Sequence, residues 1–173
     1  VGDVNRDGWP DIYVANDFFE RDYLYVNAGN GTFREQLDQQ MPYSSYFSMG
    51  MDMADVDNDG WSDIYTTDML PEDEYRLRTM ASFEGWDVYQ TKVANGYGYQ
   101  FMRNMLQRNN RNGTFTDVGQ MAGVARTDWS WSAAWCVGTW SVRGGNLPSC
   151  RGRLANRGDG VRCLSLERGA LPL

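Results

Sequence analysis

Two acidic loops carry the residues whose spacing could do chemistry. Residues 3–11 read DVNRDGWPD and residues 55–63 read DVDNDGWSD, so each loop has oxygen-bearing side chains at positions 1, 3, 5 and 9. Alternate residues of a tight loop can direct their oxygens to one centre, and the glycine at position 6 permits the sharp turn. Hard, mostly ionised oxygen ligands favour Ca²⁺ over Mg²⁺, which prefers fewer protein ligands and keeps its waters.

The alternative interpretation is a pair of solvated acidic turns, because Asp, Asn and Gly are common in turns. Two copies with the same ligand positions favour a metal, since clustered carboxylates repel one another unless a cation is present. A backbone carbonyl at position 7 would fit the same geometry. The predicted Ca²⁺ ligands are Asp3, Asn5, Asp7, Trp9 and Asp11 in the first loop and Asp55, Asp57, Asp59, Trp61 and Asp63 in the second.

The two loops differ from each other and from an EF-hand. An EF-hand needs Glu at position 12, where this chain has Val14 and Thr66. The second loop has Asp57 where the first has Asn5, and affinity depends partly on ligand charge. The sequence therefore predicts that the second loop binds Ca²⁺ more tightly.

The loops are part of a longer internal repeat. Residues 2–16 and 54–68 are identical at eight of fifteen positions with an offset of 52, and NAGNGTF at 27–33 returns as NNRNGTF at 109–115 with an offset of 82. The two offsets differ by 30 residues, which predicts an insertion in the second unit at about 69–103.

Short β-prone runs position the loops. Each loop leads into such a run, at 12–15 and 64–67, and Asn-Gly at 30–31 and at 112–113 predicts hairpin turns. Antiparallel units of this length predict an all-β fold, a partial β-propeller of about two and a half blades. In the insertion, Asp68, Pro71 and the acidic residues 72–74 predict a helix start, with Tyr75, Met80 and Phe83 on one apolar face. This helical excursion either contacts a partner or only packs on the core.

Composition excludes several classes of protein. The 173 residues contain no histidine, which rules out a Ser-His-Asp triad or a His-ligated zinc within the chain, and no catalytic residue is predicted. The net charge of −7 argues against nucleic-acid binding. No apolar run is long enough to span a bilayer.

The loops, with the β-runs that follow them, resemble the FG-GAP (VCBS-type) repeat over residues 1 to about 135. Such repeats occur in the integrin α-chain β-propeller and in the cartilage acidic protein-like (ASPIC/UnbV-containing) family. The resemblance implies Ca²⁺ bound by the loops between the strands of each blade. It also implies an extracellular, periplasmic or cell-surface protein, with a signal peptide expected upstream of Val1.

The end of the chain departs from the repeat. Residues 1–136 carry 21 acidic and 10 basic side chains, whereas residues 137–173 carry 2 acidic and 6 basic ones. A third loop is expected near position 137, but residues 137–145 read VGTWSVRGG. We therefore divide the chain into a repeat region, 1–136, and an atypical Gly/Arg-rich tail, 137–173. The tail is either a linker or basic extension, or a repeat broken by a frameshift.

Two functions remain open from the sequence. The first is a calcium-binding propeller fragment of an extracellular binding or adhesion-type protein, not an enzyme, with a protein or carbohydrate ligand. The second is a fragment of a secreted propeller enzyme acting on polysaccharide. Because the carboxylates of the two loops are committed to the metal, few acid–base pairs are expected, which favours the first; fold alone does not decide.

Overall fold

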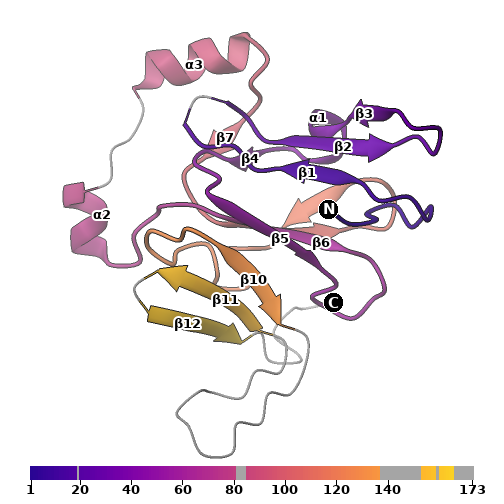
Figure 1. Ribbon diagram of the computed structural model, residues 1–173. Coiled ribbons are helices and arrows are strands. Elements are labelled where there is room, and N and C mark those ends of the chain that lie inside the picture. The colour runs from indigo at the N-terminus through magenta and orange to yellow at the C-terminus, as the bar shows by residue number, and fades with distance from the viewer. Residues whose placement is uncertain (19, 81–84, 137–152, 159, 166–173) are drawn as a thin grey trace, which may run out of the picture.

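Three antiparallel sheets follow one another through the molecule. The computed structural model describes residues 1–18, 20–80, 85–136, 153–158 and 160–165 (Figure 1). The first sheet has the order β1-β2-β3, the second β5-β6-β8-β9 and the third β10-β11-β12. The predicted all-β fold of antiparallel, blade-like units with a helical insertion is confirmed. Their strands are β1 (Ile12–Val14), β2 (Tyr23–Asn27), β3 (Phe33–Glu35), β5 (Gly50–Ala54), β6 (Asp63–Thr67), β8 (Met105–Asn109), β9 (Phe115–Asp117), β10 (Ala133–Cys136), β11 (Arg153–Gly158) and β12 (Gly160–Ser165).

The repeat is visible in the register of the first two sheets. Tyr13 pairs with Leu24 in the first sheet, and Tyr65 pairs with Leu106 at the equivalent place in the second. Each hairpin closes at its predicted Asn-Gly, where Gly31 and Gly113 have φ of 84° and 79°. Such left-handed values suit glycine. The chain therefore builds the same strand–loop–strand unit twice.

A shared core joins the first two sheets. Its buried side chains come from the first loop, from β1, β2 and α1 (Leu37–Gln40), and from β6 and β9. A smaller cluster lies on the other side of β6 and β8. Apolar area removed from water is the main stabilising term here. The shared core consists of Val4, Tyr13, Leu24, Leu37, Met41, Ile64 and Phe115, and the smaller cluster of Tyr65, Leu106, Val118 and Val124.

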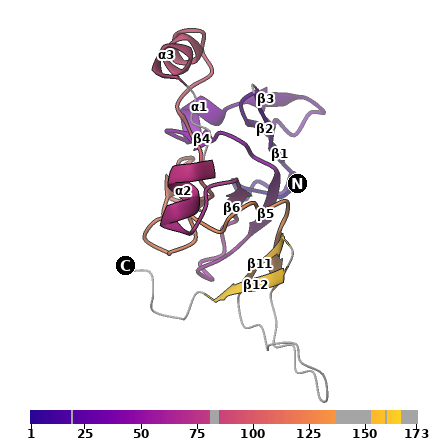
Figure 2. The same cartoon turned by 90° about the vertical axis from the view of Figure 1, so that its left-hand side faces the viewer.

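The insertion holds two helices and a short strand. α2 (Glu74–Met80) and α3 (Trp86–Ala94) lie to one side of the three sheets in Figure 1, and Figure 2 looks at the molecule from that side, with α2 in front and α3 at the top. Asp73 caps α2, because its side chain accepts a hydrogen bond from the Arg76 amide at 2.9 Å. β7 (Gln100–Phe101) then pairs in parallel with β4 (Ser44–Ser45). Within the described residues, no helix is long and apolar enough to cross a membrane.

One expectation for the insertion is wrong. Asp68 is not part of the helix start: it is fully buried, and its carboxylate accepts hydrogen bonds from the Tyr46 and Phe47 amides, both at 3.1 Å. Tyr75 is 74% exposed, and the apolar face expected of Tyr75, Met80 and Phe83 stays a prediction. The helix begins later, at Glu74, because Asp68 is drawn inward to satisfy the chain that links the first two sheets. Phe83 lies outside the described residues.

A second buried carboxylate holds the same link from the other side. Asp22 accepts hydrogen bonds from the Tyr13 hydroxyl at 2.6 Å and from the Ser48 hydroxyl at 2.7 Å. The Ser48 amide in turn donates to the carbonyl of Asn16 at 3.1 Å. The segment between the first and second sheets is therefore clasped by Asp22 and Asp68.

Parts of the tail form strands. β11 and β12 extend β10 into a three-stranded antiparallel sheet, with Trp135 opposite Leu154 and Ala155 opposite Cys163. Residues 137–152, 159 and 166–173 lie outside the described residues, and so does the position where the third acidic loop was expected. The division at residue 136 and the broken-repeat hypothesis stay predictions.

Candidate metal centre

The ninth residue of each loop joins the loop to a strand and a hairpin. Asp11 accepts hydrogen bonds from the Val4 amide at 2.9 Å and from the Asn27 amide at 2.8 Å. Asp63 repeats this geometry with the amides of Val56 at 2.9 Å and Asn109 at 2.8 Å. Both aspartates are buried. Their carboxylates therefore fix the start of the loop against the strand that follows it.

The first and fifth residues shape the turn itself. The Asp55 carboxylate accepts the amides of Asp59 at 3.0 Å and Gly60 at 2.9 Å, and Asp59 accepts the Trp61 amide at 2.8 Å. Gly60 has φ of 88°, the left-handed conformation that this turn needs. The first loop has the same three kinds of hydrogen bond, from Asp7, Gly8 and Trp9 to the carboxylates of Asp3 and Asp7. The acidic side chains therefore organise both loops before any ligand is considered.

The third position distinguishes the loops. In the first, Asn5 donates to Asp7 at 2.9 Å and accepts the Asp7 amide at 3.0 Å, so both of its polar atoms are satisfied. In the second, the Oδ1 atom of Asp57 is buried and has no hydrogen-bond partner. An unsatisfied buried oxygen is costly, and the cost is removed if it ligates a cation.

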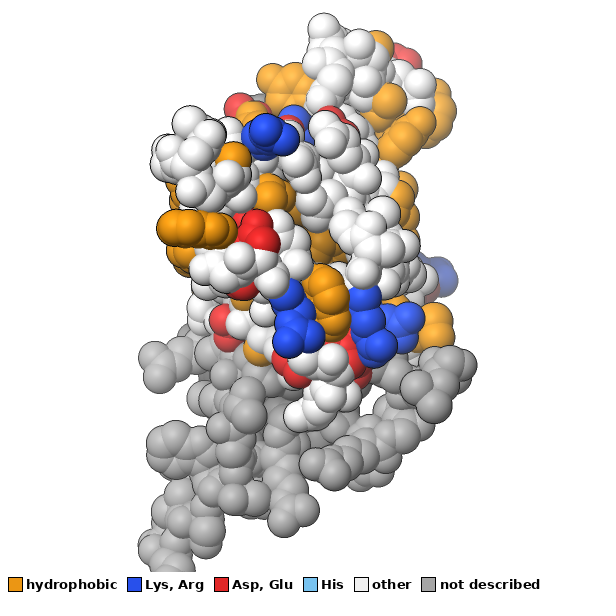
Figure 3. Space-filling model, turned by 90° about the vertical axis from the view of Figure 1, so that its right-hand side faces the viewer, with side chains coloured by type: hydrophobic (Ala, Val, Ile, Leu, Met, Phe, Trp, Pro, Cys, Tyr) orange, Lys and Arg blue, Asp and Glu red, His pale blue; other side chains and the backbone are white. Residues whose placement is uncertain are grey.

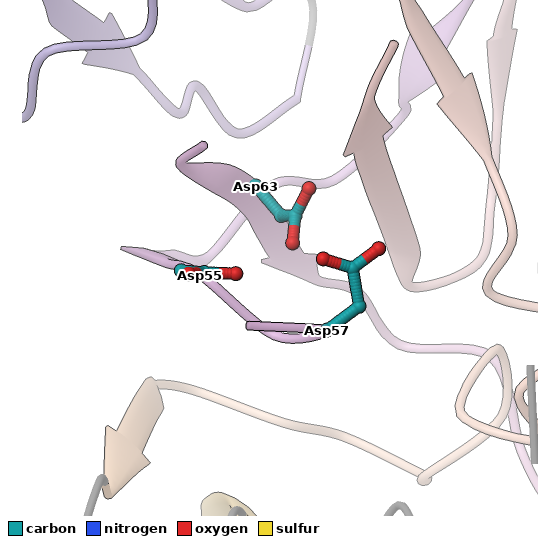
Figure 4. A group of neighbouring side chains, drawn as sticks. All are labelled: Asp55, Asp57 and Asp63. Atoms are coloured by element: carbon teal, nitrogen blue, oxygen red, sulfur yellow. The ribbon is translucent and has the colours of Figure 1, made fainter. Parts of the chain in front are cut away.

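Carboxylates converge in the second loop. One oxygen from each of Asp55, Asp57 and Asp63 lies within 4.8 Å of the other two, and the three side chains point toward a common space (Figure 4). Oxygen donors of this kind suit a hard divalent cation. Together with the unsatisfied Asp57 oxygen, this arrangement fits the predicted metal. Of the described residues, only these three form such a group of acidic, histidine or cysteine side chains; Asp59 and the aspartates of the first loop do not join one.

The electrostatics of the second loop favour a positive ligand. Burial raises the pKa of Asp63 to about 7. Hydrogen bonds from the backbone amides of Asn109 and Val56 lower this pKa, and the charges of Asp57 and Asp59 raise it. The pKa of Asp57 is also raised, by burial first and then by its acidic neighbours. A cation at this point would offset the repulsion and lower both pKa values.

Two pairs of residues beyond the loops complete the site, and the sequence interpretation missed them. Asn27 and Asn109 lie at equivalent positions of the repeated NGTF hairpins and join each hairpin to its loop. Their backbone amides donate to Asp11 and Asp63, respectively. Their side-chain amides donate to the carbonyls of Pro10 and Ser62, both at 3.2 Å. The repeated asparagine in NAGNGTF and NNRNGTF is the signal that could have found them.

The other pair, Arg108 and Arg111, is present only beside the second loop. They line a cavity of about 290 Å³ together with Asp57, Asp59, Asn109 and Asn110. The Arg111 guanidinium donates to Asp59 from Nε at 2.8 Å and pairs with it through Nη2 at 2.7 Å. Figure 3 shows Lys and Arg side chains beside Asp and Glu side chains on the face that carries the loops.

Comparison with known proteins supports the repeat. Residues 3–66 match the family model described as an FG-GAP-like repeat, a span that contains both acidic loops. The match supports an FG-GAP repeat protein, in keeping with the antiparallel, propeller-like sheets. Neither curated proteins nor solved structures give a match. The narrower resemblance to the integrin α-chain or to the cartilage acidic protein-like family stays a prediction.

Proposed function

We propose that this chain is a calcium-stabilised part of a β-propeller from an extracellular, periplasmic or cell-surface protein whose role is binding or adhesion. The observation that supports a metal site is the convergence of the Asp55, Asp57 and Asp63 carboxylates, together with the buried Oδ1 atom of Asp57, which has no hydrogen-bond partner. Ca²⁺ is the cation of choice because the loop offers carboxylates and carbonyls only.

The proposed role of the ion is structural. Each loop leads directly into a strand, β1 or β6, and the ninth aspartate is bound to a hairpin of the same sheet. An ion held there would tie the loop, the strand and the hairpin together, and its binding free energy would add to that of folding. With its carboxylates engaged in this way, the site offers no free acid–base pair, which favours a binding protein over an enzyme.

The exposed aromatic side chains support a protein or carbohydrate ligand. Trp129 and Trp131 form an edge-to-face pair with ring centroids 6.4 Å apart, and both are more than half exposed. Aromatic faces of this kind contact sugars and proteins alike.

Thermal unfolding with and without Ca²⁺ tests the proposed function. At free Ca²⁺ about a hundred times its Kd, one site adds about 2.7 kcal/mol to the free energy of unfolding. We expect a higher Tm in millimolar Ca²⁺ than in excess EGTA, and a smaller rise with the same concentration of Mg²⁺. Asp57→Asn is the matched variant, because it removes one ligand charge at an atom that has no protein partner. Equal melting temperatures in Ca²⁺ and EGTA would refute a structural metal.

A further inference from the structure

The hairpin beside the second acidic loop carries two arginines at positions where the first unit has none. With the repeats aligned at an offset of 82, Arg108 stands where the first unit has Val26, and Arg111 stands where it has Gly29. Arg6 of the first loop lies over the ring of Trp61 in the second, 5.5 Å from its centroid, so it stands between the two loops. The hairpin of the second unit therefore brings two additional positive charges to the loop with the extra carboxylate.

Arg111 keeps its place at a cost in backbone energy. Its φ is 63°, in the left-handed region, where the first unit uses Gly29 with φ of 72°. A side chain in this region costs about 1 kcal/mol relative to glycine, so an arginine here indicates a role for the side chain. The role visible in the structure is the two-pronged contact with Asp59, whose side chain is 10% exposed.

We propose that Arg111 is a positioning residue that acts as an internal counter-ion: its guanidinium pairs with Asp59, offsets the charge of that carboxylate and so lowers the Ca²⁺ affinity of the second loop. This proposal rests on the proposed function and concerns the same site. Of the loop aspartates, Asp59 is the one whose second oxygen is paired with a cation of the chain.

Charge arithmetic gives the consequence. The first loop has three carboxylates among its side-chain ligands and contains Arg6, which gives a net charge of −2. The second loop has four carboxylates, and Arg108 and Arg111 beside it also bring its net charge to −2. The electrostatic attraction for a divalent cation is therefore similar at the two loops, although the second has more ligand charge. This removes the difference in affinity that the sequence predicts.

Isothermal calorimetry with Ca²⁺ on the whole 173-residue chain tests the inference, with one loop silenced at a time. Asp7→Asn leaves the second loop to be measured, and Asp59→Asn leaves the first. Each substitution keeps the Oδ1 acceptor for the amide of Trp9 or Trp61. We expect the two loops of the otherwise unchanged chain to bind with similar affinity, in contrast to the tighter second loop that ligand charge alone predicts.

Arg111→Gly in the Asp7→Asn background is the decisive variant, because it restores the residue of the first unit. We expect it to raise the Ca²⁺ affinity of the second loop about threefold to tenfold, the range for losing a partly exposed ion pair and one nearby positive charge. Its Tm in EGTA should stay near that of the parent, since the lost ion pair and the relieved backbone offset each other.

Two controls separate this effect from net charge and from folding. Arg126→Gln removes the same charge from an exposed arginine outside the loops and should leave the affinity of the second loop unchanged. Arg111→Gly combined with Asp59→Asn should leave the first loop unchanged.

The unfavourable outcomes are distinct. If Arg111→Gly leaves the affinity of the second loop unchanged or lowers it while Ca²⁺ still binds, the counter-ion proposal fails and the calcium-binding function stands. If neither loop binds Ca²⁺ in any variant, both fail together.

Discussion

Replacing Asp22 by Asn should stabilise this protein at neutral pH, because Asp22 is a buried acid without a positive partner among the groups that face it. Burial is the first cause that raises its pKa to about 6; hydrogen bonds from Tyr13, Asn16 and Ser48 lower it, and the charge of Asp68 raises it further. The folded protein therefore holds the neutral acid more readily than the unfolded chain does.

The sign and size of the effect follow from linkage. Below pH 3.8 Asp22 is protonated in both the folded and the unfolded state. Between pH 3.8 and about 6 it ionises only in the unfolded chain, so the free energy of unfolding falls as the pH rises. Above about pH 6 it is ionised in both states and the loss is constant. A shift from 3.8 to about 6, at about 1.4 kcal/mol per pKa unit, corresponds to a loss of about 3 kcal/mol.

The second sheet shows that an amide fits this position. Asn104, at the place equivalent to Asp22, accepts the Asp68 amide at 2.7 Å and donates to the Tyr65 hydroxyl at 3.0 Å. In Asp22→Asn the amide oxygen can accept from Asn16, and the amide nitrogen can donate to the Tyr13 and Ser48 hydroxyls, which rotate to accept. The variant therefore mimics the protonated acid in geometry and charge.

Urea unfolding of wild type and Asp22→Asn at several pH values from 4 to 8, at fixed Ca²⁺, measures the difference directly. We expect a difference near zero at pH 4 that grows to about 3 kcal/mol in favour of the variant at pH 7.5. Other titrating groups largely cancel, because both proteins contain them. A difference that does not change with pH, or a variant that is less stable at every pH, would show that Asp22 is not a strained acid.

Two further predictions concern the loops and the packing of the second sheet. Asp63→Ala should lower the free energy of unfolding by about 2–4 kcal/mol even in EGTA, because it leaves the backbone amides of Val56 and Asn109 without acceptors. Asp57→Asn should change stability only when Ca²⁺ is present, because the Oδ1 atom of Asp57 has no hydrogen-bond partner. Urea unfolding in EGTA distinguishes the two variants. Gly50→Ala should cost about 1–3 kcal/mol, since its Cβ would lie 2.7 Å from the Cα of Ser132, whereas Gly85→Ala meets nothing within 4 Å and should leave the Tm nearly unchanged.

The parts of the fold that could be predicted from sequence are those set by local chemistry. The Asn-Gly turns, the β-runs after each loop and the aspartates that shape the loops depend on residues a few positions apart, and the structure has them in place. A repeat strengthens each prediction, because two independent copies of one local pattern are unlikely to arise without a common structure.

Burial of charge could not be predicted in this way. Asp22 and Asp68 are both fully buried, although an isolated aspartate in a polar segment predicts exposure. Both are buried by the segment of chain that passes between the first two sheets. In this segment the Ser45 hydroxyl donates to Asp68 and the Ser48 hydroxyl donates to Asp22. That requirement comes from the packing of one unit on the next and leaves no periodic mark on the sequence.

The metal centre shows why ligand spacing alone misjudges affinity. Spacing identifies Asp57 as an additional negative charge in the second loop, but the hairpin that closes the same blade supplies Arg108 and Arg111 at positions held by Val26 and Gly29 in the first. The extra carboxylate and the extra guanidinium groups occur together in one unit and are both missing from the other. Such a pairing indicates compensation: the second loop carries its own neutralising charge. Its preference for a cation is therefore set by the hairpin as much as by the loop.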